Sequence, residues 1–526
     1  MRAKFDPVRL EVFKNLFTSV AEEMGVALRR SSFSPNIKER LDFSCAIFNS
    51  QGEMVAQAAH IPVHLGSMPL SVQTAIKEVS TEEGDVVLTN DPFRGGNHLP
   101  DLTLVAPLYV EGGSKPLFYI ANRAHHADVG GITPGSMPLS QEIFEEGIVI
   151  PPVKIVRKGR LQKEILEVLL ANVRTPNERE GDLTAQLAAI KMGQRRLPEI
   201  VARYGEQQVT QYADFLLSYG ERMVGHCLKA IPNGSYYFED FLDDDGIGGP
   251  PVKIAVNIEI KGSRAVVDFS NSAPQVKGNM NAVYSIVNSA VFYVFRSLAG
   301  IGVPENGGCM RPIRIVAPEG SVVNARAPAA VAGGNVEVSQ RMVDVLLGAL
   351  AQARPDLVPA ASSGSMNNLT IGGWDPRRNR PFAYYETVAG GMGARPFADG
   401  LDAVHTHMTN TLNTPVEALE YDYPLMVKRY CLRPGSGGKG KFSGGKGIIR
   451  EILALTDVQV TILSERRKFR PYGLAGGEPG KPGKNYLITT SGQEKLLPSK
   501  VCLRIKKGEI IGMATPGGGG HGKPGR

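Results

Sequence analysis

Residues 97–110 read NHLPDLTLVAPLYV, and residues 117–131 read LFYIANRAHHADVGG. Each segment holds a run of apolar and β-branched residues of strand length, and Glu111-Gly112-Gly113-Ser114 between them has the composition of a turn. The two segments therefore predict an antiparallel hairpin. If its turn is centred near residue 113, opposite residues have numbers that add up to about 226, so Asp101 faces His125.

The open end of the predicted hairpin gathers side chains that bind metals. His98 lies three residues before Asp101, in a loop that can fold back towards His125. Two imidazoles and one carboxylate suit a divalent first-row metal such as zinc, manganese or iron, with positions left open for water and substrate. A one-residue slip of register would turn a side chain to the opposite face, and H-x-x-D pairs also occur by chance. The spacing alone therefore leaves a purely structural role open.

Three further polar residues are candidates for the same site. His126 and Asp128 follow His125 closely and could orient a ligand ring or transfer a proton. Asp42 stands at the start of an earlier predicted strand and is a candidate fourth ligand, although nothing local fixes its position. Adjacent histidines are also common as surface residues or as hydrogen-bonded core residues, so both roles stay open.

The pattern of apolar residues along the chain predicts an α+β protein with mixed, largely antiparallel sheets, helices and several domains. Helices are predicted over 7–29, 69–79, 183–204, 207–229, 283–299 and 338–353, and strands over 42–48, 53–58, 86–88, 252–260, 264–269 and 458–463.

A chain of 526 residues exceeds the size of one hydrophobic core. We expect an N-terminal α+β domain with the metal site over 1–182, a helical segment over 183–234, and a glycine-rich α+β domain over 235–526.

The composition argues against several other classes of protein. The net charge is +7, but the basic residues are scattered among acidic ones, unlike the concentrated basic face of a nucleic-acid-binding protein. No run approaches the roughly 18 apolar residues of a membrane span. The five cysteines lie far apart without a C-x-x-C pair, and the N-terminus lacks the pattern of a signal peptide. We therefore expect a cytoplasmic protein with reduced thiols that binds neither nucleic acid nor membrane.

A glycine-rich segment and two later histidines are candidates for a nucleotide-binding loop and a second metal site. The segment from Gly435 to Phe442 nearly spells a phosphate-binding P-loop, but Phe442 stands where a serine or threonine should bind magnesium. We predict a loop there, a flexible tail over 517–520, and no nucleotide site in this chain. His405 and His407 could form a metal pair on one strand face, but their polar surroundings favour a structural or substrate-lining role.

Six motifs together resemble the hydantoinase B/oxoprolinase family, and the likeness covers nearly the whole chain. They are SPNIKERLDFSCAIF (34–48), TNDPFRGGNHLPD (89–101), AHHADVGG (124–131), AGGN (332–335), ETVAGGMG (386–393) and NTPVE (413–417). That family includes B-type subunits of ATP-dependent N-methylhydantoinases, oxoprolinases, caprolactamase, and related subunits of acetone and acetophenone carboxylases.

The resemblance implies a metal and a partner. In a similar acetone carboxylase subunit, manganese is held by both residues of an H-x-x-D pair and by a later histidine. Matching the motifs places these roles on His98, Asp101 and His125. The relative has no histidine at the position that corresponds to His126, which favours His125 as the ligand. The resemblance also implies a separate A-type subunit with an actin-like fold that binds ATP and magnesium, in a heterotetramer with this chain.

The resemblance further implies ATP-dependent opening of a small cyclic amide such as a hydantoin, 5-oxoproline or a lactam. The partner would phosphorylate the amide oxygen, and water activated by the metal would attack the adjacent carbon. His126, Asp128 or Asp42 would accept or relay the proton. The alternative is a subunit of an ATP-dependent ketone carboxylase, but such acetone carboxylase subunits are considerably longer than this chain. A non-catalytic scaffold would have no need of the intact metal-binding set.

Overall fold

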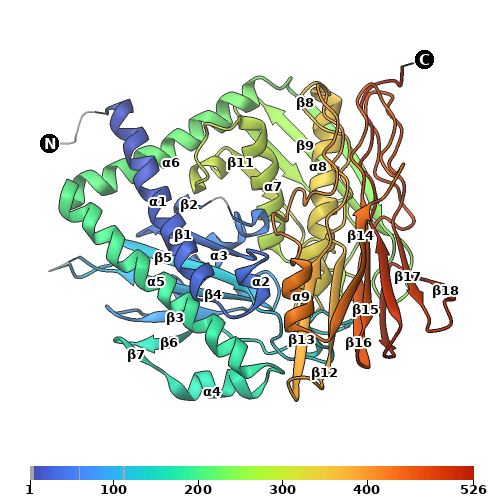
Figure 1. Ribbon diagram of the computed structural model, residues 1–526. Coiled ribbons are helices and arrows are strands. Elements are labelled where there is room, and N and C mark those ends of the chain that lie inside the picture. The colour runs from blue at the N-terminus through green and yellow to red at the C-terminus, as the bar shows by residue number, and fades with distance from the viewer. Residues whose placement is uncertain (1–4, 59, 111–112, 526) are drawn as a thin grey trace.

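The computed structural model describes residues 5–58, 60–110 and 113–525, and the strands within these ranges form four sheets of seven, four, four and five strands. Of the described strand pairs, only β10 and β11 run parallel. Helices pack between and beside the sheets (Figure 1). The predicted α+β class with largely antiparallel sheets is therefore confirmed.

The seven-stranded sheet has the order β2-β1-β5-β4-β3-β6-β7. Its strands are β1 (Phe43–Asn49), β2 (Met54–Gln57), β3 (Val86–Thr89), β4 (Asp101–Leu108), β5 (Phe118–His125), β6 (Val153–Arg157) and β7 (Arg160–Leu161). The helices in this part of the chain are α1 (Pro7–Ser31), α2 (Pro35–Lys38), α3 (Ser67–Glu78), α4 (Lys163–Ala171), α5 (Pro176–Tyr204) and α6 (Glu206–Lys229), with short turns η1 (Pro62–His64), η2 (Pro92–Arg94) and η3 (Ile143–Glu145).

Side chains of β5 alternate between two helical layers because successive residues of a strand point to opposite faces. The Asn122 side chain donates to the backbone of α5, whereas Arg123 donates to Ser67 and Ser71 of α3. The sheet is thus covered by α5 on one face and by α3 on the other. Successive side chains of β5 therefore face these two helices in turn.

The later part of the chain adds three sheets. The first contains β8 (Gly234–Leu242), β9 (Val252–Lys261), β10 (Arg264–Asp268) and β11 (Ile313–Val316); the second contains β12 (Asn368–Asp375), β13 (Arg380–Thr387), β16 (Val458–Leu463) and β19 (Lys500–Ile505). The third contains β14 (Leu425–Leu432), β15 (Ile448–Ala454), β20 (Ile510–Ala514), β17 (Lys484–Ile488) and β18 (Glu494–Leu497). The helices here are α7 (Tyr284–Ala299), α8 (Ser339–Ala353) and α9 (Val416–Asp422), with η4 (Gly307–Met310) and the π-helical turn η5 (Gly334–Val338).

The central hairpin has the predicted register. β4 pairs with β5 in antiparallel fashion, and Asp101 lies opposite His125. The predicted turn includes residues 111 and 112, which lie outside the described residues. The sequence did not predict β12, because Gly372 and Gly373 are typical of loops. A Cβ at Gly372 would lie 2.2 Å from the side chain of Pro134, so close packing explains the glycine within this strand.

Two hydrophobic clusters hold the described residues together. One extends from α1 and the seven-stranded sheet to α7 and α8, and the other lies between the two C-terminal sheets. The predicted domain boundaries stay a prediction.

The predicted flexible tail over 517–520 is wrong, because these glycines are buried. The amides of Gly518, Gly519 and Gly520 donate to backbone carbonyls of three other segments. A Cβ at Gly518 would lie 2.0 Å from the Met392 carbonyl oxygen. Glycine here permits close approach of backbones rather than mobility. The P-loop-like segment is irregular, as predicted, and its Gly438 amide donates to Gly518.

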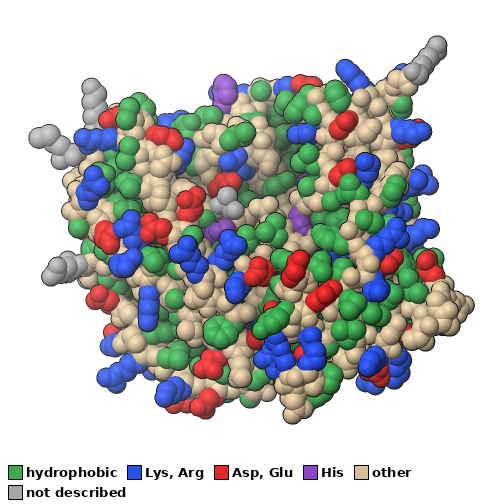
Figure 2. Space-filling model, in the orientation of Figure 1, with side chains coloured by type: hydrophobic (Ala, Val, Ile, Leu, Met, Phe, Trp, Pro, Cys, Tyr) green, Lys and Arg blue, Asp and Glu red, His purple; other side chains and the backbone are tan. Residues whose placement is uncertain are grey.

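On the face shown in Figure 2, acidic and basic side chains are interspersed, without a large area of one sign. Within the described ranges, every helix is too short or too polar to cross a membrane.

Candidate metal site

Three side chains at the open end of the β4–β5 hairpin form a compact group of potential metal donors. His98 Nε2 lies 3.2 Å from Asp101 Oδ1 and 3.2 Å from His125 Nδ1, and His125 Nδ1 lies 3.1 Å from Asp101 Oδ1. Each of these residues is at most 2% exposed. We call these three atoms the donor triangle. The structure thus brings together the three ligands that the sequence predicts.

The size of the donor triangle fits a first-row cation. For a cation about 2.1 Å from each atom, edges of 3.1–3.2 Å correspond to ligand–cation–ligand angles of roughly 97°. Such a triangle would hold a cation from one side, and further positions of that cation would remain for other ligands. Two nitrogens and one oxygen suit manganese, iron or zinc better than calcium or magnesium, which prefer oxygen.

Local folding places each donor. Asp101 is the first residue of β4, and His125 is the last residue of β5, so the ladder sets these two side chains opposite each other. His98 lies in the bend before β4, where the Asp101 amide donates to the His98 carbonyl at 3.1 Å. This short turn returns the His98 ring to the end of the hairpin.

The second carboxylate oxygen of Asp101 is held from outside the donor triangle. Asn97 Nδ2 donates to Asp101 Oδ2 at 3.1 Å, and His64 Nε2 lies 3.3 Å from the same oxygen. His64 Nδ1 in turn lies 2.9 Å from the Ser44 hydroxyl. Partners of this kind fix the orientation of a ligand and are a regular feature of metal sites.

The electrostatic setting favours the protonation states that a metal needs. Burial raises the pKa of Asp101, but His98, His125 and His64 outweigh it, and the pKa lies well below its ordinary value. Burial lowers the pKa of His125, and hydrogen bonding to Asp101 offsets this only in part. An ionised carboxylate beside a neutral imidazole is the form in which these side chains ligate metals.

Residues from the distant sheet β12–β13 complete the surroundings of His125. The Tyr385 ring stacks on the His125 ring with centroids 4.5 Å apart, and the Arg40 guanidinium lies 4.8 Å from the Tyr385 ring centroid. The Tyr385 hydroxyl donates to Asn368 at 2.9 Å, and Asn368 donates to Glu337 at 2.7 Å. This chain of contacts restrains the His125 ring.

The π-helical turn η5 approaches the donor triangle from another side. Asn335 Nδ2 lies 3.0 Å from His98 Nε2. The segment before η5 is anchored by Glu146, whose Oε1 accepts hydrogen bonds from the amides of Val331 and Ala332. π-Helical turns occur often at functional sites, and here the turn brings an amide side chain to His98.

The other predicted site residues lie apart from the donor triangle. His126 follows the strand alternation to the α5 side, where its Nε2 lies 2.9 Å from Gln186 Oε1, and burial lowers its pKa to about 4. Asp128 accepts hydrogen bonds from three backbone amides, including that of Arg174, and forms an ion pair with the Arg174 side chain at 3.0 Å. These contacts tie both side chains to other segments of the fold, and their catalytic role stays a prediction.

Asp42 lies beside the site without joining the donor triangle. Its carbonyl accepts the His125 amide at 3.0 Å, and its carboxylate lies 3.9 Å from Arg40. Burial raises the pKa of Asp42, and the charges of His125 and Arg40 oppose this rise. Its role as a fourth ligand stays a prediction.

The two later histidines lie in separate surroundings. His407 Nδ1 lies 3.3 Å from the Tyr293 hydroxyl, and His407 Nε2 lies 4.0 Å from Asp344. His405 lies near Arg40, and burial lowers its pKa to about 3. Among the described residues, the group of metal donors is the one formed by His98, Asp101 and His125.

The sequence did not single out His64 or Tyr385. His64 is distant from the hairpin along the chain and reaches Asp101 only because η1 is packed against it. Tyr385 belongs to another sheet, and no local spacing indicates its stacking on His125.

Comparison with known proteins identifies a family. Residues 6–524 match the model of the family described as hydantoinase B/oxoprolinase. An uncharacterized protein of Methanocaldococcus jannaschii is 42% identical, over 99% of this chain and 91% of its own length. A 5-oxoprolinase of Dictyostelium discoideum is also 42% identical, over 99% of this chain but 40% of its own length. The chain thus spans about two fifths of that longer protein.

Two solved structures share the fold. The ATP-dependent caprolactamase of Pseudomonas jessenii has a TM-score of 0.92 and 30% identity, over 99% of this chain and 92% of its own. An acetone carboxylase chain has a TM-score of 0.89 and 19% identity, over 99% of this chain and 76% of its own. The second likeness shows a common fold alone.

Proposed function

Since the chain belongs to the hydantoinase B/oxoprolinase family, we propose that it is the metal-binding catalytic chain of an ATP-dependent enzyme that opens a cyclic amide. The donor triangle of His98, Asp101 and His125 carries this proposal. The caprolactamase supports the cyclic amide as substrate class, because its name states that activity and its structure covers nearly the whole chain.

We further propose a separate A-type subunit as the site of ATP binding. A relative from a Pseudomonas species, described as one subunit of a D-/L-hydantoinase, is 32% identical over 99% of this chain and 90% of its own length. The name of that relative implies further subunits, and this chain matches it nearly end to end. In the longer 5-oxoprolinases the corresponding function would belong to the same polypeptide.

A divalent cation held by His98, Asp101 and His125 would supply Lewis-acid chemistry, which activates water and polarises a carbonyl. The chain itself orients these ligands: His64 and Asn97 hold the Asp101 carboxylate, and Tyr385 restrains the His125 ring. The burial of all three donors excludes bulk water and strengthens electrostatic interactions within the site.

Proton transfer requires a group near the reacting atoms. The sequence proposes His126, Asp128 and Asp42 for this role. His126 contacts Gln186, and Asp128 forms an ion pair with Arg174. The charge of Asp42, in contrast, interacts with His125, Asp101 and His98. We therefore propose Asp42 for proton transfer at this site, with His126 and Asp128 supporting the surrounding backbone.

Co-expression with an A-type subunit tests the proposed function. ATP turnover is measured with hydantoin, 5-oxoproline and caprolactam, and with acetone plus bicarbonate. We expect turnover with at least one cyclic amide and its loss in His98→Ala and Asp101→Ala. Turnover of the ketone that requires bicarbonate would instead establish a carboxylase, and amide opening that survives both substitutions would rule out the donor triangle.

A further inference from the structure

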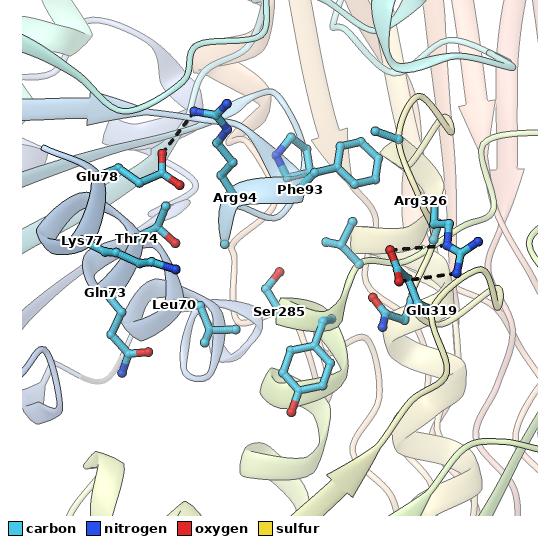
Figure 3. A pocket seen from close by; sticks show the side chains of 17 residues that line it. Leu70, Gln73, Thr74, Lys77, Glu78, Phe93, Arg94, Ser285, Glu319 and Arg326 are labelled. Atoms are coloured by element: carbon cyan, nitrogen blue, oxygen red, sulfur yellow. Dashed lines mark hydrogen bonds and ion pairs between the residues drawn. The ribbon is translucent and has the colours of Figure 1, made fainter.

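A cavity of about 920 Å³ adjoins the loop that leads into His98 (Figure 3). Its walls are the second half of α3, the turn η2 with Gly95, the first turn of α7, and the loop 319–327. Cavities of several hundred Å³ that combine apolar walls with a few polar groups are typical of small-molecule sites. The donor triangle does not line this cavity, so it is a separate feature of the molecule.

Two arginines of the cavity walls form ion pairs. Arg94 pairs with Glu78 at 3.1 Å and with Asp91 at 3.5 Å, and on the opposite wall Arg326 pairs with Glu319 at 3.4 Å. Lys77 also lines the cavity, and within the described residues no ion pair is formed by it. Its ammonium group points into the space between the walls in Figure 3. The Lys77 ammonium group is therefore the cation of this lining that is available to a bound anion.

The first turn of α7 adds a second feature that favours an anion. The first amides of a helix have no acceptor within the helix. In α7 no side chain caps them, and the first turn contains no acidic residue. The Ser285 hydroxyl is unavailable for capping because it donates to the Gly96 carbonyl at 2.5 Å. The rings of Phe93 and Tyr284 line the same cavity. An anionic group on a flat apolar body matches this lining.

We propose that this cavity binds a small organic anion, with a carboxylate or phosphate near Lys77 and the first turn of α7. The same contacts would link the bound anion to the donor triangle. The Gly95 carbonyl accepts from Ser71 of α3 at 2.7 Å, and Gly96 accepts from Ser285 of α7. The chain then runs directly through Asn97 to His98. Movement of α3 or α7 on anion binding therefore changes the position of two residues that hold Asp101 or the metal.

This proposal is independent of the cyclic amide and of the ATP-binding partner. Anion affinity is measured on the full chain by calorimetry with phenyl phosphate and benzoate, and phenol serves as the neutral probe. We expect phenol not to bind at concentrations that saturate the better anion. The preferred anion indicates a phosphate or a carboxylate as the natural group. Equal affinity for phenol would overturn the proposal.

Substitutions locate the site. Lys77→Met should weaken anion binding about fivefold, as expected for a partly exposed ion pair, and Lys77→Arg should restore most of it. Lys191→Met, on an exposed face of α5, makes the same change of net charge away from the cavity and should alter affinity less than about twofold. Equal weakening in Lys77→Met and Lys191→Met would show that only net charge acts and would refute the site.

Linkage tests the communication with the metal. Mn²⁺ affinity is measured with and without the saturating anion, and anion affinity with and without Mn²⁺. Because coupling is reciprocal, both should change by the same factor, about fivefold or more. Ser285→Ala should reduce this factor while anion binding persists. Affinities that do not change at all would refute the coupling.

Discussion

Replacement of Asp101 by asparagine removes the carboxylate of the donor triangle and keeps the shape of the side chain. The asparagine cannot satisfy both sides of the site. An amide nitrogen at Oδ2 would face the Asn97 amide, which donates there at 3.1 Å, and an amide nitrogen at Oδ1 would face the cation. Loss of an outer partner of a ligand lowers metal affinity by about 10- to 100-fold. We therefore expect a loss of about 100-fold or more for the ligand itself.

This loss of Mn²⁺ affinity lowers the stabilisation that bound metal gives to the folded chain. At free Mn²⁺ equal to 100 times the wild-type Kd, binding raises the free energy of unfolding by about 2.7 kcal/mol. After a 100-fold loss of affinity the same concentration equals the Kd of the variant, and the increase is about 0.4 kcal/mol. The metal-dependent stabilisation should therefore fall by about 2.3 kcal/mol.

The assay is urea unfolding of the full chain, with chelator and with this fixed concentration of Mn²⁺. Asp85→Asn is the matched control, because Asp85 is also buried and forms an ion pair with Lys154 at 2.8 Å, away from the donor triangle. The control should lose stability with chelator yet keep its full response to Mn²⁺. An unchanged Mn²⁺ response in Asp101→Asn would refute Asp101 as a ligand.

Three further outcomes follow from features described above. His126→Ala should lower the free energy of unfolding by about 1–3 kcal/mol, because it leaves the buried side-chain amide of Gln186 without its partner. The affinity for Mn²⁺ should stay within about twofold of wild type. Loss of the Mn²⁺ response would place His126 among the ligands. Burial raises the pKa of Glu146 to about 7, above its ordinary value of 4.5. The favourable contribution of Glu146 to the free energy of unfolding is therefore fully present below pH 4.5 and is lost as the pH rises through about 7. In urea unfolding, the free energy of unfolding of Glu146→Gln should therefore rise relative to that of wild type by up to about 3 kcal/mol between pH 4 and pH 8. A difference between the two proteins that does not change with pH would contradict this. Gly518→Ala should destabilise the chain by more than about 3 kcal/mol, because its Cβ meets backbone at 2.0 Å, whereas Gly525→Ala, with nothing within 4 Å, should be neutral in the same assay.

The donor triangle could be predicted from the sequence because its arrangement is local. The pairing of Asp101 with His125 follows from one hairpin, and period-two alternation then separates His125 from His126. Tyr385 and His64 could not be predicted in the same way, because their contacts depend on how distant segments pack.

Glycine composition was the least informative part of the sequence. The same residues suit a mobile tail and a place where two backbones touch, since both require the absence of a side chain. Only the neighbours distinguish these cases. For Gly518 the neighbour is the Met392 carbonyl, and for Gly372 it is Pro134.

The central position of β20 bears on how the chain is synthesised. β20 (Ile510–Ala514) lies between β15 and β17 in its sheet, although both of these strands leave the ribosome earlier. Until residue 514 emerges, the facing edges of β15 and β17 carry unpaired backbone groups that can pair with other chains. Folding of this five-stranded sheet therefore waits for translation to pass β20. Slow translation between residues 488 and 510 would prolong the aggregation-prone stage, and chaperones that hold nascent chains should raise the soluble yield.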